Sequence, residues 1–164
     1  TLIGVADRGV PCAGMIDIPI LKETYIGYLI DQNERFCQMN GIMVCTSNCQ
    51  ELRSARIATT SPLALSASGV AGFNQLAARA AVTTYGGDCY NYALLAAGHI
   101  DLVMEDSLAP HDMLAVVAVM QAAGATVTDT AGQPILNGQS TSILAAANPA
   151  LHKAALAVLA EQGI

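Results

Sequence analysis

The chain has 164 residues, of which 53% are hydrophobic and 12% charged, and its formal net charge is −6 with a pI near 4.7. Its seven lysine and arginine residues are scattered, which argues against a nucleic-acid partner because such a surface needs clustered basic charge. No apolar run approaches the roughly 18 residues of a transmembrane helix, so we expect no membrane partner. The length suits one domain with a substantial core, and the low charge indicates that large faces are buried.

The first 45 residues have the pattern of antiparallel strands. Apolar runs predict strands at residues 1–6, 10–20, 24–30 and 35–45. Asp7-Arg8-Gly9 is a turn signal, residues 31–34 are predicted to form a polar loop, and Asn40-Gly41 is a hairpin signal. We therefore expect about four antiparallel strands. The composition becomes polar near Thr46, and we place a domain boundary there, between residues 1–45 and 46–164.

Residues 46–164 alternate strand and helix patterns. The predicted strands cover residues 56–60, 81–85, 100–104, 125–128 and 142–146, and the predicted helices cover residues 70–79, 88–97, 113–123 and 149–161. Gly98 and Gly124 end two of these helices, and Asn148 precedes the last one as its N-cap. In that last helix, His152 is predicted to be exposed. The alternation predicts an α/β fold, a mixed sheet with helices on both faces, preceded by the antiparallel strands of the N-terminal region.

The five cysteines are odd in number and lack the pairing with histidine that marks zinc sites. They are Cys12, Cys37, Cys45, Cys49 and Cys89. We interpret them as reduced thiols of a cytoplasmic protein. The alternative is a metal clip formed by Cys45 and Cys49.

Three acids stand at the ends of predicted elements rather than in their middles. Asp88 opens a helix after two glycines, Glu105 ends a buried strand, and Asp112 precedes a second helix. In open α/β sheets, ligands bind beyond the carboxyl ends of strands, where helices begin. Helix N-termini attract phosphate, and carboxylate oxygens suit Mg²⁺. The three acids therefore predict a site in one crevice.

Each acid also has a purely structural interpretation. Asp88 and Asp112 can be N-caps, a role worth about 1 kcal/mol, and spacing alone favours this role for Asp112. Glu105 can be exposed at the rim of the sheet, because burying an unpaired carboxylate is costly. Thr60 and Ser61 end a strand nearby and either line the same crevice or form an ordinary turn.

The stretch that carries these acids resembles the second signature of the inositol monophosphatase superfamily. The matching residues are Gly86-Gly87-Asp88-Cys89-Tyr90, Ala96-Ala97-Gly98, Asp101, Glu105 and His111-Asp112. The run Gly-Gly-Asp-Cys-Tyr is similar to the bacterial histidinol-phosphate phosphatase branch. Gln121-Ala122-Ala123-Gly124-Ala125 is similar to the family's Glu-Ala-Gly-Gly turn, although Ala125 replaces its second Gly. His111 departs from the family's usual Trp.

The resemblance implies an activity and a role for each residue. Asp112 matches the family's metal ligand, for Mg²⁺, while Asp88 and Glu105, with Gly86 and Gly87, match positions at the alcohol portion of the substrate. A carboxylate at Asp88 would suit the amine of histidinol. The implied reaction is hydrolysis of a small phosphate monoester, histidinol phosphate, by metal-activated water. The family is commonly dimeric, and its complete fold is layered.

Two further acidic motifs of the family are absent from the sequence. They are Gly-Glu-Glu and Asp-Pro-Ile-Asp-Gly-Thr, and both would precede Thr1. We therefore expect this chain to be the C-terminal portion of such an enzyme, inactive alone, with exposed strand edges in residues 1–45 that pair between molecules or stay disordered. The alternatives to histidinol phosphate within the superfamily are inositol phosphate, a sugar bisphosphate and a nucleotide 3′-phosphate. A non-catalytic binding or dimerisation module that keeps the fold is the alternative of a different class.

Overall fold

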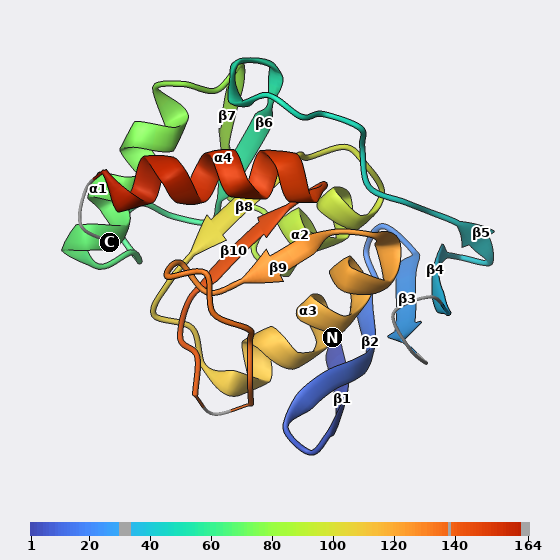
Figure 1. The fold of residues 1–164 in the computed structure, drawn as a ribbon. Helices are drawn as coiled ribbons and strands as arrows, with labels where there is room; N and C mark the ends of the chain where they lie inside the picture. Colours follow the sequence, from blue (N-terminus) through green and yellow to red (C-terminus); the bar gives the residue numbers. More distant parts are fainter. Residues whose placement is uncertain (30–33, 138, 162–164) are drawn as a thin grey trace.

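Two five-stranded sheets and four α-helices make up the described part of the chain, which is residues 1–29, 34–137 and 139–161 of a computed structural model (Figure 1). Sheet A is antiparallel throughout, in the order β1-β2-β3-β4-β5. Its strands are β1 (Leu2–Asp7), β2 (Val10–Ile18), β3 (Glu23–Leu29), β4 (Arg35–Met39) and β5 (Ile42–Met43). The predicted antiparallel region is therefore confirmed. The predicted polar loop at residues 31–34 lies outside the described residues except for its last position.

Sheet B is mixed, in the order β7-β6-β8-β10-β9. Its strands are β6 (Arg56–Thr59), β7 (Val82–Tyr85), β8 (Leu102–Glu105), β9 (Thr126–Thr128) and β10 (Ile143–Ala146). The helices are α1 (Ala67–Ala77), α2 (Cys89–Ala96), α3 (Pro110–Ala123) and α4 (Pro149–Ala160), with a short 3₁₀ helix η1 (Leu52–Ser54). β7, β6 and β8 are parallel, and β10 is antiparallel to both β8 and β9.

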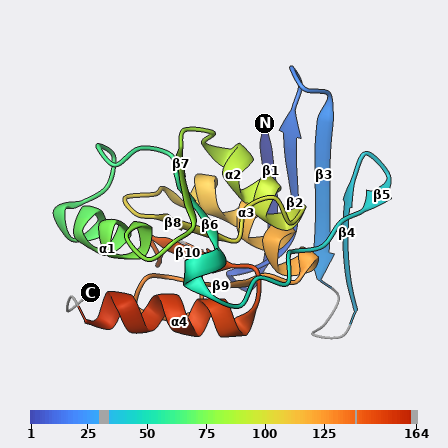
Figure 2. The same ribbon diagram turned by 90° about the horizontal axis from the view of Figure 1, so that it is seen from above.

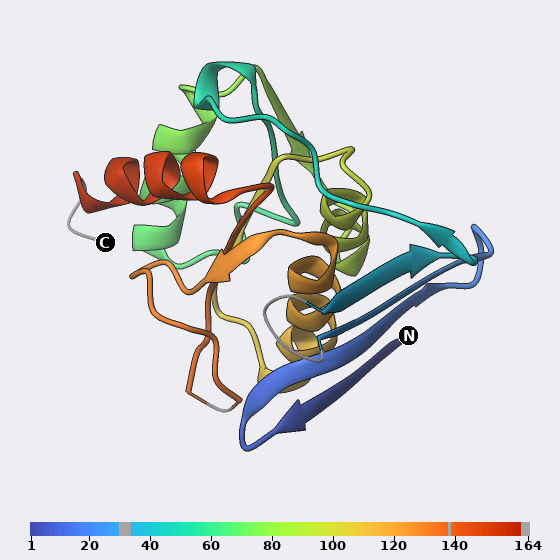
Figure 3. The ribbon, with the colours of Figure 1, turned by 45° about the vertical axis from the view of Figure 1, so that its right-hand side comes forward.

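Helices cover both faces of sheet B, which confirms the predicted fold class. α2 and α3 pack on one face, and α1 and α4 pack on the other (Figure 2). α3 lies between the two sheets (Figure 3), and nine of its 14 residues are buried. A helix that is apolar all round is expected in such a central position. Buried residues of both sheets pack against α3 in one hydrophobic core. The two sheets are thus not separated by a gap in the core, and the domain boundary near Thr46 stays a prediction.

α3 docks directly onto the backbone of sheet A through a row of glycines. Gly4, Gly14 and Gly27 are cross-strand partners on β1, β2 and β3. A Cβ added at Gly14 would lie 2.2 Å from the carbonyl oxygen of Ala115 in α3, which is far closer than real Cβ contacts. Only a residue without a side chain allows this approach.

The opposite face of sheet A is apolar and open. Ile3, Val5, Ile26 and Tyr28 point to this side in register, and each is at least 36% exposed. Tyr28 stacks on Phe36 of β4, with ring centroids 5.0 Å apart. We call these five residues the open face of sheet A.

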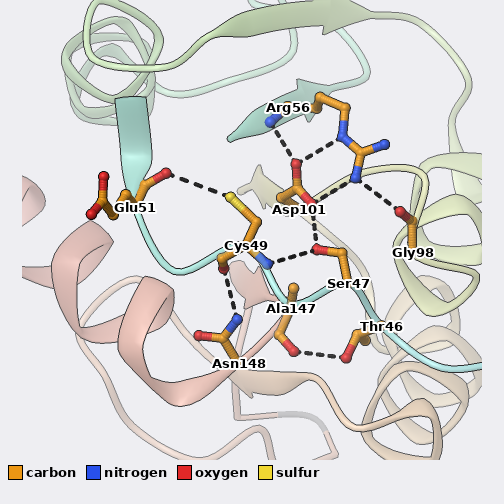
Figure 4. Close-up of polar contacts among 9 residues, drawn as sticks. All are labelled: Thr46, Ser47, Cys49, Glu51, Arg56, Gly98, Asp101, Ala147 and Asn148. Carbon is orange, nitrogen blue, oxygen red and sulfur yellow. Dashed lines mark hydrogen bonds and ion pairs between the residues drawn. The ribbon is translucent and has the colours of Figure 1, made fainter. Parts of the chain in front are cut away.

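The buried carboxylate of Asp101 connects the segment that links the two sheets with β6, the first strand of sheet B in the sequence (Figure 4). Asp101, which is 1% exposed, accepts hydrogen bonds from Ser47 Oγ (2.5 Å) and from the backbone N (2.7 Å) and guanidinium (2.8 Å) of Arg56. Arg56 also donates to the carbonyl of Gly98. Burial by itself would raise the pKa of Asp101, but these donors outweigh it and lower the pKa below its usual value.

The same connecting segment is fastened at two further points (Figure 4). Thr46 Oγ1 donates to the carbonyl of Ala147, and the amide of Asn148 donates to the carbonyl of Cys49. Asn148 also accepts a hydrogen bond from the backbone N–H of Leu151, which confirms its predicted role as the N-cap of α4. All five cysteines are free.

Two details of the sequence prediction need correction. α3 begins at Pro110, with Ala109 as its N-cap, so Asp112 lies inside the first turn rather than before the helix. His152 is buried rather than exposed, because it lies under β9, where its Nε2 is 2.9 Å from Thr128 Oγ1. Within the described residues, every helix is too short or too polar to cross a membrane.

Candidate functional site

A cavity of about 160 Å³ opens at the carboxyl ends of β6 and β8. These strands are parallel neighbours, which brings residues that follow them to the same edge of sheet B. The cavity is lined by Thr59, Thr60, Ser61, Ala64, Leu65, Asp88, Glu105, Asp106, Ser107 and Leu108. We call it the acidic cavity. Asp88 and Glu105 are therefore brought together as predicted, and Thr60 and Ser61 line the crevice instead of forming only an ordinary turn.

Glu105 is buried in the wall of the acidic cavity and is held by three donors. Its Oε1 accepts from the backbone N–H (2.8 Å) and the hydroxyl (2.5 Å) of Thr60, and its Oε2 accepts from the Tyr92 hydroxyl (2.7 Å). Glu105 is only 6% exposed. The interpretation of this carboxylate as exposed at the sheet rim is therefore wrong, and the cost of its burial is offset by hydrogen bonds.

Asp88 reaches the cavity from a strained turn. Gly86, Gly87 and Asp88 all have positive φ, and Asp88 has φ 48°, a conformation that residues with a side chain rarely adopt. The side chain of Asn91 donates to the carbonyl of Gly86 at 2.7 Å and fixes the turn. Asp88 occupies the N-cap position of α2, but its side chain makes no capping hydrogen bond. Capping therefore does not account for this carboxylate.

A third carboxylate of the cavity, Asp106, was not predicted. It accepts hydrogen bonds from the backbone N–H (3.0 Å) and the hydroxyl (2.6 Å) of Ser66, the N-cap of α1, and from the hydroxyl of Ser107. These contacts connect the end of β8 to the start of α1. Because Ser66 and Asp106 are 40 residues apart, local patterns in the sequence carry no signal for this pair.

Asp112 is not among the residues that line the acidic cavity. Its Oδ2 accepts from the backbone N–H of Ala109 at 3.2 Å, and its side chain is 47% exposed. Across residues 1–29, 34–137 and 139–161, no group of three His, Cys, Asp or Glu side chains gathers as a metal site would require. The described residues therefore do not fit a complete metal site, and metal binding by Asp112 stays a prediction.

The two predicted glycines line a different space. Gly86 and Gly87 border a cavity of about 380 Å³ beside β7 and α2, together with Tyr85 and His99. Their structural role is clear, because a Cβ added at Gly87 would lie 2.6 Å from the side-chain oxygen of Asn91. A direct contact of Gly86 and Gly87 with substrate stays a prediction.

Sequence reasoning missed Tyr92, which donates a hydrogen bond to Glu105 but does not line the cavity. Burial, followed by the nearby Glu105 carboxylate, holds the pKa of Tyr92 well above its usual value, so its hydroxyl remains a donor. One signal was available. Tyr92 lies one helical turn after Asp88, and a buried tyrosine hydroxyl needs a hydrogen-bond partner.

The acidic cavity suits a positively charged ligand. It gathers the carboxylates of Asp88, Glu105 and Asp106, and none of the described residues that line it is lysine, arginine or histidine. Hydrogen bonds from a cationic donor to a carboxylate are roughly twice as strong as those between neutral groups. An ammonium group is therefore favoured here over a neutral hydroxyl.

Comparison with known proteins agrees with this architecture. The model of the inositol monophosphatase family matches residues 1–163. The bifunctional phosphatase IMPL2 of Arabidopsis thaliana is 40% identical over 163 residues, which cover 95% of this chain and 46% of that protein. A histidinol-phosphatase of Chlorobaculum parvum is 28% identical over 162 residues, which cover 96% of this chain and 59% of that protein.

A solved inositol monophosphatase from Zymomonas mobilis superposes with a TM-score of 0.91 at 33% identity, over 97% of this chain and 61% of that one. This chain thus spans about half the length of the curated relatives that it matches. The family match extends over nearly all of its residues, and both sheets take part in the superposition. The chain belongs to the inositol monophosphatase family.

Proposed function

We propose that this chain forms the alcohol-binding portion of a phosphatase whose preferred substrate is histidinol phosphate. One observation carries the proposal: the acidic cavity presents three carboxylates and, among the described residues that line it, no cationic side chain. Histidinol bears an amine that is protonated at neutral pH, whereas inositol bears only hydroxyls. One of the relatives supports the choice, since it is a histidinol-phosphatase.

Asp88 and Glu105 are the residues proposed to bind the amine. Glu105 is fixed by its three donors, and Asp88 keeps its carboxylate free of a capping bond. Glu105 is buried and Asp88 is exposed, so Glu105 should contribute most of the discrimination, because a neutral ligand leaves a buried charge uncompensated.

Members of the family are generally metal-dependent, and we propose Mg²⁺ as the metal and Asp112 as one of its ligands. One carboxylate does not make a site, so the proposal requires acidic residues beyond those described here. We accordingly expect this chain to release no phosphate by itself. Its assembly as a dimer and its cytoplasmic location are also proposals.

The test is phosphate release by the product of the complete coding sequence, with Mg²⁺, from histidinol phosphate, inositol phosphate and a nucleotide 3′-phosphate. We expect kcat/KM for histidinol phosphate to exceed the other two by at least about tenfold, and Asp112→Asn to lower it by about a hundredfold. Asp88→Ala should raise KM for histidinol phosphate and leave inositol phosphate unaffected. Preference for inositol phosphate, or an unchanged KM for histidinol phosphate in the Asp88 variant, would contradict the proposal.

A non-catalytic binding module is the second candidate, favoured by the lack of a three-ligand metal cluster among the described residues. The same assay separates the two. A complete protein that binds histidinol but releases no phosphate with any of several divalent metals would be such a module.

A further inference from the structure

Hydrogen bonds from two described residues, Thr60 and Tyr92, use part of the acceptor capacity of the Glu105 carboxylate. An ionised carboxylate has about four acceptor positions, two on each oxygen. Thr60 occupies both positions on Oε1, through its backbone N–H and its hydroxyl, and Tyr92 occupies one on Oε2. The described residues therefore leave about one acceptor position, on Oε2, for a group in the cavity.

The two side chains that hold Glu105 come from different elements of the fold. Thr60 lines the cavity at the end of β6, whereas Tyr92 is 3% exposed, lies on α2 and does not line the cavity. The start of α2 is fixed, because the side-chain amide of Asn91 donates to the carbonyl of Gly86 in the preceding turn at 2.7 Å. Tyr92, which donates to Glu105, is therefore held in place by the packing of α2 in the core.

We propose that Tyr92 and Thr60 are positioning residues that turn the Glu105 carboxylate so that the open acceptor position on Oε2 receives an N–H of the ligand's ammonium group. This inference rests on the proposed function, because it takes the ligand to be an amino alcohol. Neither side chain need touch the ligand's amine. Their effect is to fix the direction in which Glu105 accepts, and a charged hydrogen bond depends strongly on that direction.

The substitutions that test this are small. Tyr92→Phe removes one hydroxyl and keeps the ring in the core, and Thr60→Val removes the side-chain donor while the backbone donor stays. Thr60→Ser retains the hydroxyl and should rescue binding. Tyr90→Phe is the matched control, because it removes a hydroxyl from the same helix without touching Glu105.

The measurement is binding of histidinol, and of the analogue in which hydrogen replaces its amine, by titration calorimetry of the 164-residue chain. We expect Tyr92→Phe to raise Kd for histidinol by about tenfold, and Thr60→Val by a smaller factor, with little change for the amine-free analogue. Tyr90→Phe and Thr60→Ser should bind histidinol as the original chain does. A purely structural role for Tyr92 would weaken both ligands alike.

The outcomes are distinct. Equal Kd values for histidinol in the original chain and in both the Tyr92→Phe and Thr60→Val variants would overturn the positioning role and leave the proposed function standing. Failure of the original chain to bind histidinol would overturn both. An amide NMR spectrum of each variant confirms that the fold is retained.

Discussion

The two sheets of this protein are equally apolar in sequence but are covered differently. Sheet B is packed by helices on both faces, and every residue of β8 and β10 is buried. In the described part of the chain, helices pack on one face of sheet A, chiefly α3, and Ile3 and Val5 are more than half exposed on the other. Strand periodicity alone therefore does not tell how many faces of a sheet are buried.

The difference in helix cover between the two sheets agrees with the position of the acidic cavity. The acidic cavity lies at the edge of sheet B, where helices hold the strand ends from both sides, and Glu105 is fixed there by Thr60 and Tyr92. A site on rigid elements keeps its geometry better than one on a loosely held sheet. The predictions that follow test this contrast.

The largest effect is expected where sheet A meets α3. Gly14→Ala puts a methyl group against the backbone of Ala115, so α3 must move away from the sheet. We expect the free energy of unfolding to fall by at least about 3 kcal/mol in urea titrations. Val5→Ala, on the open face, serves as the control and should cost less than about 1 kcal/mol. A tolerated Gly14→Ala would show that α3 is not closely docked.

An isoleucine from each sheet tests the contrast directly. Ile57 of β6 is 1% exposed, whereas Ile3 of β1 is 55% exposed. Truncation to alanine should cost about 3 kcal/mol at Ile57, because it leaves a cavity, and less than about 1 kcal/mol at Ile3. Chemical unfolding measures both. Similar losses at the two positions would mean that the open face is covered in solution.

Asp101 should stabilise the start of sheet B in a pH-dependent way. Asp101→Asn removes a buried partner of Arg56 and should cost about 2–3 kcal/mol at neutral pH. Because the folded pKa of Asp101 is lowered, its contribution is fully present above the unfolded value of about 4 and is lost as the pH falls through the folded pKa. Stability measured against pH should thus show a smaller acid loss in the variant.

The exposed ion pair between Glu51 and Arg53 is the control for Asp101. Glu51→Gln should change stability by no measurable amount, because exposed pairs are screened by water and salt. An effect as large as that of Asp101→Asn would show that burial is not what makes the Asp101 pair important.

A small effect on stability is also expected on the open face. Ile26→Lys with Tyr28→Lys should leave the free energy of unfolding nearly unchanged while reducing the binding of an apolar dye such as ANS. Unchanged dye fluorescence would show that these side chains are not available to solvent.

Local signals made much of the fold predictable. Glycines and Asn148 marked helix ends, and the alternation of strands and helices predicted a mixed sheet with two covered faces. The start of α3 was misplaced although Pro110 was a readable signal, since proline favours the first helical position.

The candidate site was only partly predictable. Asp88 and Glu105 could be placed together because strand ends share an edge of the sheet. The contact of Thr60 with Glu105 joins residues 45 positions apart, and that of Ser66 with Asp106 joins residues 40 positions apart. Contacts of this kind come from the fold as a whole and leave no local pattern in the sequence.

The most direct test of this account is to titrate the chain, side by side, with histidinol and with Mg²⁺ and to record the heat of binding. The account places the alcohol-binding residues in this chain and finds no complete metal site among the described ones. It predicts saturable binding of histidinol that is lost in Glu105→Gln, and no saturable binding of Mg²⁺ alone. Saturable binding of Mg²⁺ without any binding of histidinol would contradict it.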